Sequence, residues 1–293
     1  DKQLFKPMGR KRRPKPSYRR GRYRLLVVPV RFADHSDRPV PTRRQLDVLY
    51  NSDKRNAELA PTGSLRTIYH EQSDTKFDLR SIIAPRWIDL PNPEAYYADE
   101  DGGRVDRIKM DELMHFVLDD LDADGDFNFD RGGRGQFIGV NIVMSGYGAE
   151  FGGTDCNTGA SSTERLWSHQ WQTAEWTSAK EAGVKFNKYA LTSAFWGTCG
   201  YTLQKLLPIY HETLHLAGLR DLYYMNGDGY AGVGAWDVMV RFLFCVLFRF
   251  LCHIVCRFVG MQVSRARLLS HATYRHISQY YNAISLFVCA YSY

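Results

Sequence analysis

The residues best able to do chemistry together lie close along the chain, in the run His-Glu-Thr-Leu-His-Leu-Ala-Gly-Leu-Arg-Asp at 211–221. On an α-helix, residues four apart share one face, so His211 and His215 can direct both imidazoles at a single ion. Glu212 lies about a quarter-turn away, where its carboxylate can reach a metal-bound water without being a ligand. Asp221 adds a hard anionic ligand. Three protein ligands, with a fourth position left for water, are what a catalytic zinc site requires.

The helix that must position these residues has recognisable limits. Pro208 suits the first turn of a helix, because its missing N–H leaves no hydrogen bond unmade there. Gly218 can adopt the left-handed conformation that ends a helix. We therefore expect a helix over residues 203–217, after which the chain turns back towards Asp221. A lone His or Glu is usually a surface or core residue, but the whole pattern favours a metal site.

Met239 ends a second run, Gly-Val-Gly-Ala-Trp-Asp-Val-Met, which follows the histidine motif. Methionine is the residue type found in the turn beneath the metal in metzincin zinc proteases. Near an apolar run a methionine more often simply packs in a core. Its position after the histidine motif favours the structural turn.

These residues resemble the immune inhibitor A family of secreted, metzincin-like zinc metalloendopeptidases, whose motif has Asp as its third ligand. Residues 211–224 and 234–239 carry the resemblance, which extends over residues 24–240. The shorter matches are residues 63–66, Tyr69, 72–73, 145–150, 152–153 and 166–169. The resemblance implies an α/β, metzincin-like catalytic domain, with a twisted mixed sheet, a backing helix near residues 104–120 and a zinc-binding active-site helix below the sheet.

Length and charge suggest how the chain is divided. With 293 residues and 44% hydrophobic content, it can bury one sizeable core. Residues 1–24 hold eleven of the 38 Lys and Arg but one of the 32 acidic residues, so the remainder carries a net charge of about −4. We expect residues 1–23 to be a basic disordered linker or a propeptide remnant, and residues 24–241 to form the catalytic domain. No signal peptide is visible at the start, so we expect a fragment or a processed form.

The pattern of apolar residues predicts the elements of this domain. Strands are expected at residues 24–32, 76–83, 137–144 and 185–192, with a bulge or an end at Pro29. Helices are expected at residues 42–50, at 63–73 with Ser64 as its N-cap, and at 104–121. Residues 87–97 are expected to be an ordered loop, and the glycine-rich residues 146–153 an edge strand and loop beside the cleft.

An acidic ladder follows the third of these helices. Asp120, Asp122, Asp124 and Asp126 alternate as in the start of an EF-hand calcium loop, with Gly125 in the sixth position. The twelfth position is Arg in place of a bidentate Glu, so the loop is not a complete EF-hand. Calcium is therefore one hypothesis, and a solvated acidic turn is the other.

Two further features leave alternatives open. Cys156 and Cys199 lie inside the region of resemblance and can form a disulfide in a secreted protein, or remain two free thiols. His169, in a segment that resembles the family, can support the metal site from outside the ligand set, although packing is the simpler role.

Residues 242–293 do not resemble the family. Residues 242–259 approach the length of a membrane span, but Arg249, His253 and Arg257 interrupt them, and a charge near the bilayer centre costs about 2.5–3.5 kcal/mol on insertion scales. We expect an atypical tail that is mistranslated or truncated. The alternatives are a helix that caps the fold and a membrane anchor.

The sequence thus predicts a secreted zinc endopeptidase. Zinc held by His211, His215 and Asp221 would activate a water, and Glu212 would take its proton and pass it to the leaving amine. We expect a monomer that acts on proteins or peptides, with no nucleic-acid partner and no membrane attachment. Two other classes remain: a catalytically inactive metallopeptidase-like protein, and a module that binds polyanions or membranes through its basic segment and apolar tail.

Overall fold

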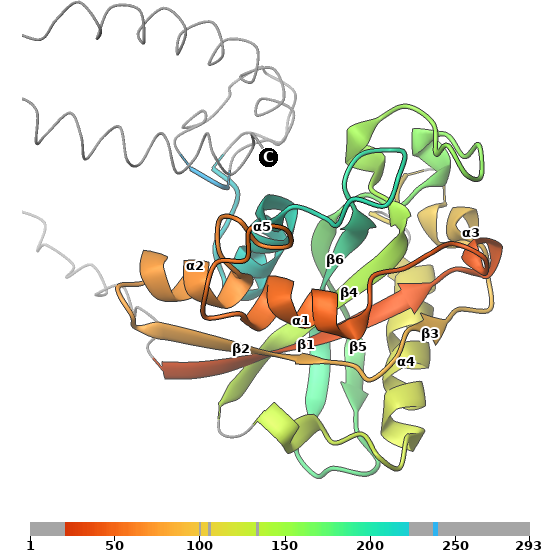
Figure 1. Ribbon diagram of the computed structural model, residues 1–293. Coiled ribbons are helices and arrows are strands. Elements are labelled where there is room, and N and C mark those ends of the chain that lie inside the picture. The colour runs from red at the N-terminus through yellow and green to blue at the C-terminus, as the bar shows by residue number, and fades with distance from the viewer. Residues whose placement is uncertain (1–20, 100, 105–106, 133–134, 223–236, 240–293) are drawn as a thin grey trace, which may run out of the picture.

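The computed structural model describes residues 21–99, 101–104, 107–132, 135–222 and 237–239, which form an α/β fold around one mixed sheet (Figure 1). The sheet has six strands in the order β2-β1-β4-β6-β5, and β3 pairs with the end of β1. The strands are β1 (Gly21–Arg31), β2 (Phe77–Ile83), β3 (Ile88–Asp89), β4 (Gln136–Tyr147), β5 (His169–Thr177) and β6 (Lys185–Phe195). Strand β5, at the edge, runs antiparallel to β6, and the other pairings are parallel.

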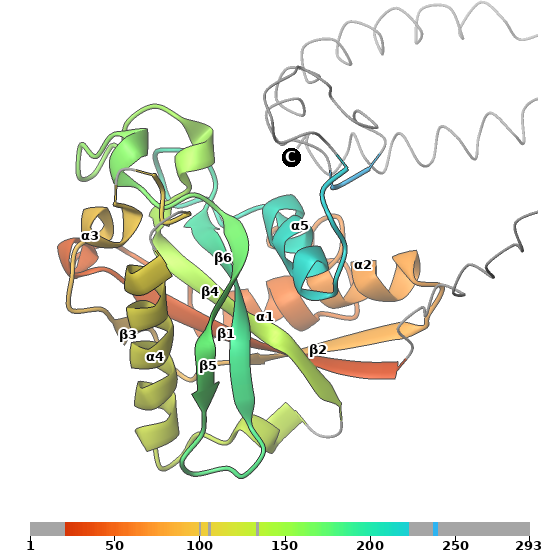
Figure 2. The same cartoon turned by 180° about the vertical axis from the view of Figure 1, so that it is seen from behind.

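Helices cover both faces of the sheet. The helices are α1 (Arg43–Asn51), α2 (Leu65–Gln72), α3 (Glu94–Ala98), α4 (Arg107–Ala123) and α5 (Leu206–Leu216). Helix α4 packs on one face, and α1, α2 and α5 pack on the other. Accordingly, α1 lies in front of the strands in Figure 1, and α4 comes to the front in Figure 2. This arrangement confirms the predicted α/β class with a mixed sheet and a backing helix. None of the described helices is long and apolar enough to cross a membrane.

Strand β1 shows how the sequence produces two cores. Leu26 and Val28 face the cluster that contains α4, whereas Leu25 and Val27 face the cluster that contains α1, α2 and α5. All four side chains are fully buried. A parallel strand with both faces covered has a continuous apolar run because alternate residues enter opposite cores.

Pro29 lies inside β1 and causes neither of the predicted interruptions. Its partner on β4 is Val143, while the pairing of β1 with β2 ends at Val27 and the pairing with β3 begins at Val30. Proline lacks an N–H to donate to a neighbouring strand. Pro29 is tolerated because it lies between the residues of β1 that pair with β2 and those that pair with β3.

The predicted helix starts are confirmed at two caps. The hydroxyl of Thr42 accepts a hydrogen bond from the backbone N–H of Gln45, whose side chain accepts from the N–H of Thr42. Ser64 Oγ accepts from the N–H of Thr67 at the start of α2. Both caps satisfy N–H groups that a first helical turn leaves without partners.

Two local predictions were wrong. Residues 87–97 contain β3 and most of α3 and are not a plain loop. Residues 146–153 do not begin as an edge strand, because Gly146 and Tyr147 end β4, which lies between β1 and β6. Strand β5, at one edge of the sheet, was not predicted, since its sequence is largely polar and exposed.

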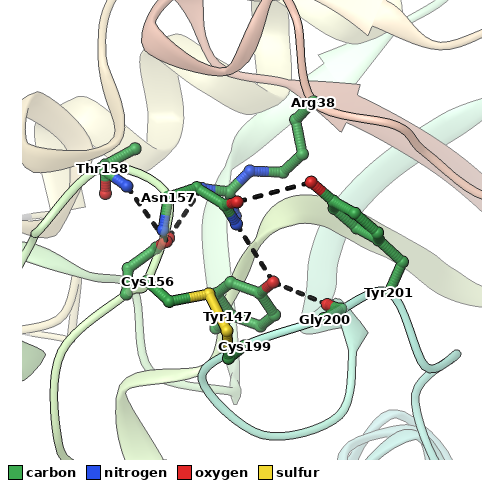
Figure 3. The surroundings of a disulfide bond; sticks show 9 residues. Arg38, Tyr147, Cys156, Asn157, Thr158, Cys199, Gly200 and Tyr201 are labelled. Atoms are coloured by element: carbon green, nitrogen blue, oxygen red, sulfur yellow. Dashed lines mark hydrogen bonds and ion pairs between the residues drawn. A yellow bond between two sulfur atoms is a disulfide. The ribbon is translucent and has the colours of Figure 1, made fainter.

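A disulfide joins Cys156 to Cys199 and confirms the first of the two alternatives for these residues (Figure 3). Cys199 lies in the connection from β6 to α5, and Cys156 in the loop after β4. The Tyr147 hydroxyl donates to Gly200 O at 2.6 Å, and the Cys156 N–H donates to Thr198 O at 3.1 Å. The disulfide therefore anchors the segment that leads into α5.

Replacing both disulfide cysteines, Cys156→Ser with Cys199→Ser, is expected to lower the free energy of unfolding by about 2–4 kcal/mol, because the unfolded chain loses a constraint across 43 residues. Urea denaturation with and without a reductant measures the effect. The reductant should destabilise the parent protein but not the double variant. Equal stability of the two proteins under oxidising conditions would contradict the prediction.

Candidate metal centre

Helix α5 begins and ends for the predicted reasons, although it starts three residues later than expected. Pro208 lies in its first turn, where a missing N–H has no consequence. Gly218, just beyond the helix, has φ +97°, and its N–H donates to His215 O. The N–H of Leu219 donates to Leu214 O, so the glycine turn satisfies carbonyls at the end of the helix.

Packing against the sheet fixes the position of α5. Its buried apolar side chains are Leu206, Ile209, Tyr210, Leu214 and Leu216. Gly139 on β4 makes the close approach possible, since a Cβ there would come within 2.8 Å of the Leu216 side chain. On the α2 side, the Tyr69 hydroxyl donates to Thr213 Oγ1 at 3.2 Å.

The three predicted ligands converge at the C-terminal end of α5. Asp221 Oδ1 lies 3.3 Å from His211 Nε2 and 3.4 Å from His215 Nε2. Each of the three side chains is about 15% exposed. These three residues form one of two groups in the described part of the chain that could hold a metal ion.

Backbone carbonyls orient both imidazoles. His211 Nδ1 donates to Val238 O at 2.7 Å, and His215 Nδ1 donates to Leu219 O at 2.9 Å. A carbonyl can only accept, so each Nδ1 carries a proton, and each Nε2 faces Asp221. This is how metal-binding histidines are held in one tautomer.

Met239 packs in the core, and its predicted role in a turn beneath the metal stays a prediction. Its side chain is 1% exposed and belongs to the core cluster that contains α5. The Met239 carbonyl accepts from the N–H of Leu222, one residue after Asp221. The carbonyl of Val238 accepts a hydrogen bond from His211. Residues 238–239 therefore contact both His211 and the segment that contains Asp221.

The donor set fits zinc in number, kind and spacing. Zinc bonds of about 2.0–2.1 Å at tetrahedral angles place two ligand atoms about 3.3–3.4 Å apart, as in both histidine–aspartate pairs. The same separations are long for charge-assisted hydrogen bonds, which measure about 2.7–2.9 Å. Asp221 Oδ1 is buried and has no hydrogen-bond partner. A cation between the three side chains would satisfy it.

The pKa values show how strongly these groups interact. Burial opposes the charged imidazole, but the carboxylates of Asp221 and Glu212 raise the pKa of His211 to about 9. Burial likewise opposes the charged form of Asp221, yet the two imidazoles hold its pKa well below the usual range. A centre of positive charge is therefore favourable beside Asp221, and a divalent cation provides one.

Glu212 lies beside the ligands without joining them. Its Oε1 is 3.9 Å from His211 Nε2, and its side chain is 9% exposed. Burial raises the pKa of Glu212 to about 7, with the two imidazoles opposing and the charge of Glu150 adding to the rise. A carboxylate with raised proton affinity, close to the ligand set, can act as a proton acceptor.

The acidic ladder behaves differently from His211, His215 and Asp221. Asp120 pairs with Arg86 at 2.7 Å, and Asp122 accepts hydrogen bonds from Ser178 and the N–H of Ala179. The Lys180 ammonium donates to the carbonyls of Asp124 and Phe127, both at 2.8 Å. Asp124 accepts from the N–H of Asp126. The described contacts thus satisfy much of the ladder without a metal, and calcium binding here stays a prediction.

His169 is a packing residue in its described contacts. Its Nδ1 donates to Trp167 O, and its Nε2 hydrogen-bonds the Tyr189 hydroxyl, both at 2.7 Å. Burial lowers the pKa of His169 to about 4, so the ring is neutral near pH 7.

Glu150 is a residue near the site that the sequence did not single out. Its buried carboxylate accepts from the backbone N–H and the hydroxyl of Ser168, and burial raises its pKa. A side chain at Gly148 would collide with this carboxylate. The sequence signal for this buried carboxylate was the pair of glycines at 146 and 148, because a glycine leaves space for a neighbouring side chain.

No model of a known protein family matches this chain, and no curated protein matches its sequence at a significant level. What the site can do is therefore argued from its residues, its geometry and the resemblance of its motif.

Zinc binding should depend on the convergent ligands. His211→Ala or Asp221→Asn is expected to lower zinc affinity by at least about 10–100-fold, measured by competition with a zinc-binding dye. His70→Ala removes an exposed histidine from α2 and serves as the matched control, with unchanged affinity. Equal affinities in all these proteins would place zinc elsewhere.

Acid should destabilise the fold partly through His169. Its pKa is about 4 when folded and about 6.5 when unfolded, so this residue's share of stability is present above pH 6.5 and lost as the pH falls towards 4. The loss amounts to about 3 kcal/mol. His169→Phe cannot titrate, so its free energy of unfolding should fall less between pH 7 and pH 4. Denaturant melts at both values measure this, and parallel losses would contradict it.

Proposed function

We propose that this protein is a secreted zinc endopeptidase with a metzincin-like catalytic domain. One observation carries the proposal: two imidazole nitrogens face one oxygen of Asp221 at 3.3 and 3.4 Å, and Glu212 lies beside them outside the ligand set. This is the arrangement that the sequence motif predicts for a zinc site with its own proton acceptor.

The chain's own residues divide the chemistry between them. His211, His215 and Asp221 would hold zinc, which when bound supplies a Lewis acid and lowers the pKa of a water in its open position. Glu212 would accept a proton from the attacking water and then deliver it to the leaving amine. The hydrogen bonds from the imidazoles to Val238 O and Leu219 O keep the ligand geometry fixed throughout.

An extended substrate fits the edge of the sheet. Strand β5 ends the strand order, and α5 packs beside it. A peptide can add to such an edge through main-chain hydrogen bonds, which recognise backbone in preference to particular side chains. This geometry favours protein or peptide substrates and an endopeptidase that accepts chain on both sides of the cleaved bond.

Two other features support the details of the proposal. The Cys156–Cys199 disulfide favours a compartment outside the reducing cytosol. The mixed sheet with an antiparallel edge, the backing helix α4 and the site helix α5 on the opposite face are the parts expected of a metzincin-like domain.

The test is the loss of proteolysis without the loss of metal. Glu212→Gln is expected to lower kcat for casein cleavage by about 10²–10⁴-fold, because an amide cannot accept the proton. Zinc content should remain that of the parent protein. The control Glu71→Gln changes an exposed carboxylate on α2 and should cleave normally.

Two results would overturn the proposal. Casein cleavage by the parent protein that persists in 1,10-phenanthroline would show that no metal is needed. A parent protein that retains zinc at His211 and His215 but cleaves neither casein nor gelatin would be a catalytically inactive relative of such enzymes.

A further inference from the structure

A second cluster of possible metal ligands lies buried at the end of β1, away from the α5 site. It consists of His35, Glu94 and Asp155, whose ligand atoms all lie within 4.8 Å of one another. The residues are 2%, 2% and 0% exposed. His35 follows β1, Glu94 begins α3 and Asp155 lies in the disulfide loop, so the His35 cluster joins three segments that are distant in sequence.

One pair in the His35 cluster is spaced as if to share an ion. His35 Nε2 lies 3.6 Å from Glu94 Oε2, too far for a hydrogen bond. Two bonds of about 2.1 Å to a common metal span this distance at an ordinary coordination angle. Glu94 Oε2 is buried without a hydrogen-bond partner, whereas Glu94 Oε1 accepts from the N–H of Leu166 at 3.1 Å.

The other nitrogen of His35 has the partner that a metal-binding histidine needs. Ser145 Oγ lies 2.9 Å from His35 Nδ1. A ring with its proton on Nδ1 donates to this hydroxyl and leaves the Nε2 lone pair facing Glu94. Burial, reinforced by the charge of Arg38, lowers the pKa of His35 to about 4, so the imidazole is neutral and able to bind a metal near pH 7.

The cluster holds more negative than positive charge. The positive charge comes from the guanidinium of Arg38, which pairs with Asp155 at 2.7 Å. Asp34, partly exposed, adds a carboxylate oxygen 3.9 Å from His35 Nε2. With Glu94 and Asp155 ionised, three carboxylates face one guanidinium, which leaves two negative charges for a divalent cation to neutralise. Burial is the main reason that the pKa of Glu94 is raised to about 8, and the nearby charges of Asp34 and Asp155 add to the rise while Arg38 opposes it.

The surrounding backbone is shaped to keep Glu94 in place. A side chain at Gly146 would collide with the Glu94 carboxylate, so the glycine at the end of β4 provides its space. The backbone N–H of Glu94 donates to Asp34 Oδ1 at 3.1 Å. Arg38 also donates to Ser145 O at 3.1 Å. The carboxylate is thus held inside the fold by several segments.

We infer that His35, Glu94 and Asp155 form a second, structural metal site, which binds a divalent transition-metal ion. The donor set of one imidazole nitrogen and carboxylate oxygens suits zinc, iron or manganese, whereas calcium prefers oxygen ligands alone. Asp155 is already paired with Arg38, so it completes a site whose principal ligands are His35 and Glu94. The ion would join β1, α3 and the disulfide loop, and it takes no part in the proposed hydrolysis.

The experiment removes the α5 site first and then counts the remaining metal. The His211→Ala/His215→Ala protein, loaded with Zn²⁺ and dialysed, should retain one equivalent by plasma mass spectrometry, against two in the parent protein. Adding Glu94→Gln should remove the remaining equivalent. Glu71→Gln in the same background is the control and should keep it. Because this count needs no activity, it is independent of whether the protein is a protease.

Thermal unfolding gives a second measurement that does not require the Glu94 variant to fold. In the His211→Ala/His215→Ala background, Zn²⁺ should raise Tm and EDTA should lower it, because an ion that binds only the folded state stabilises it. No retained zinc and no Tm shift would overturn the inference, and they would indicate that a proton on Glu94 balances the cluster. Zinc retained equally after Glu94→Gln would also overturn it.

Discussion

The candidate centre depends on one constraint: the Asp221 carboxylate must meet two imidazoles whose Nε2 atoms already face it. A cation in this position is stable only if each ligand is held before the ion arrives. The hydrogen bonds to Val238 O and Leu219 O provide that preorganisation, since they fix both ring tautomers and both ring orientations. Without the cation, Asp221 Oδ1 is a buried acceptor with no partner, which costs about 1–3 kcal/mol or more for a charged group. An ion bound there would remove this cost and so stabilise the fold.

The rest of the fold serves to bring these groups together. Strands β1, β4 and β6 form a buried platform, and α5 lies on it through Leu214 and Leu216, with Gly139 allowing the close approach. At one end of α5 the disulfide anchors the incoming segment, and at the other end the Gly218 turn directs the chain back to Asp221. Met239 fills the core beneath. Each of these elements limits the freedom of a ligand or of its supporting carbonyl.

Sequence reasoning succeeded where the chemistry is local in the chain. The four-residue spacing of His211 and His215, the cap at Ser64, and the helix end at Gly218 all follow from backbone geometry over a few residues. It failed where the cause is distant. The carbonyls of Val238 and Leu219 carry no sequence signature, because any residue supplies a carbonyl. The polar edge strand β5 has no apolar pattern to reveal it. The ammonium of Lys180 reaches the carbonyls of Asp124 and Phe127, which lie 56 and 53 residues earlier in the chain.

The central claim is that His211, His215 and Asp221 hold zinc with an open position beside Glu212. Crystals of the zinc-loaded protein, measured on both sides of the zinc absorption edge, test it most directly. The account predicts an anomalous peak about 2.0–2.2 Å from His211 Nε2, His215 Nε2 and an Asp221 oxygen, with a solvent ligand on the side of Glu212. Zinc-loaded crystals with no peak at these three residues, or with Glu212 itself as a ligand, would contradict it.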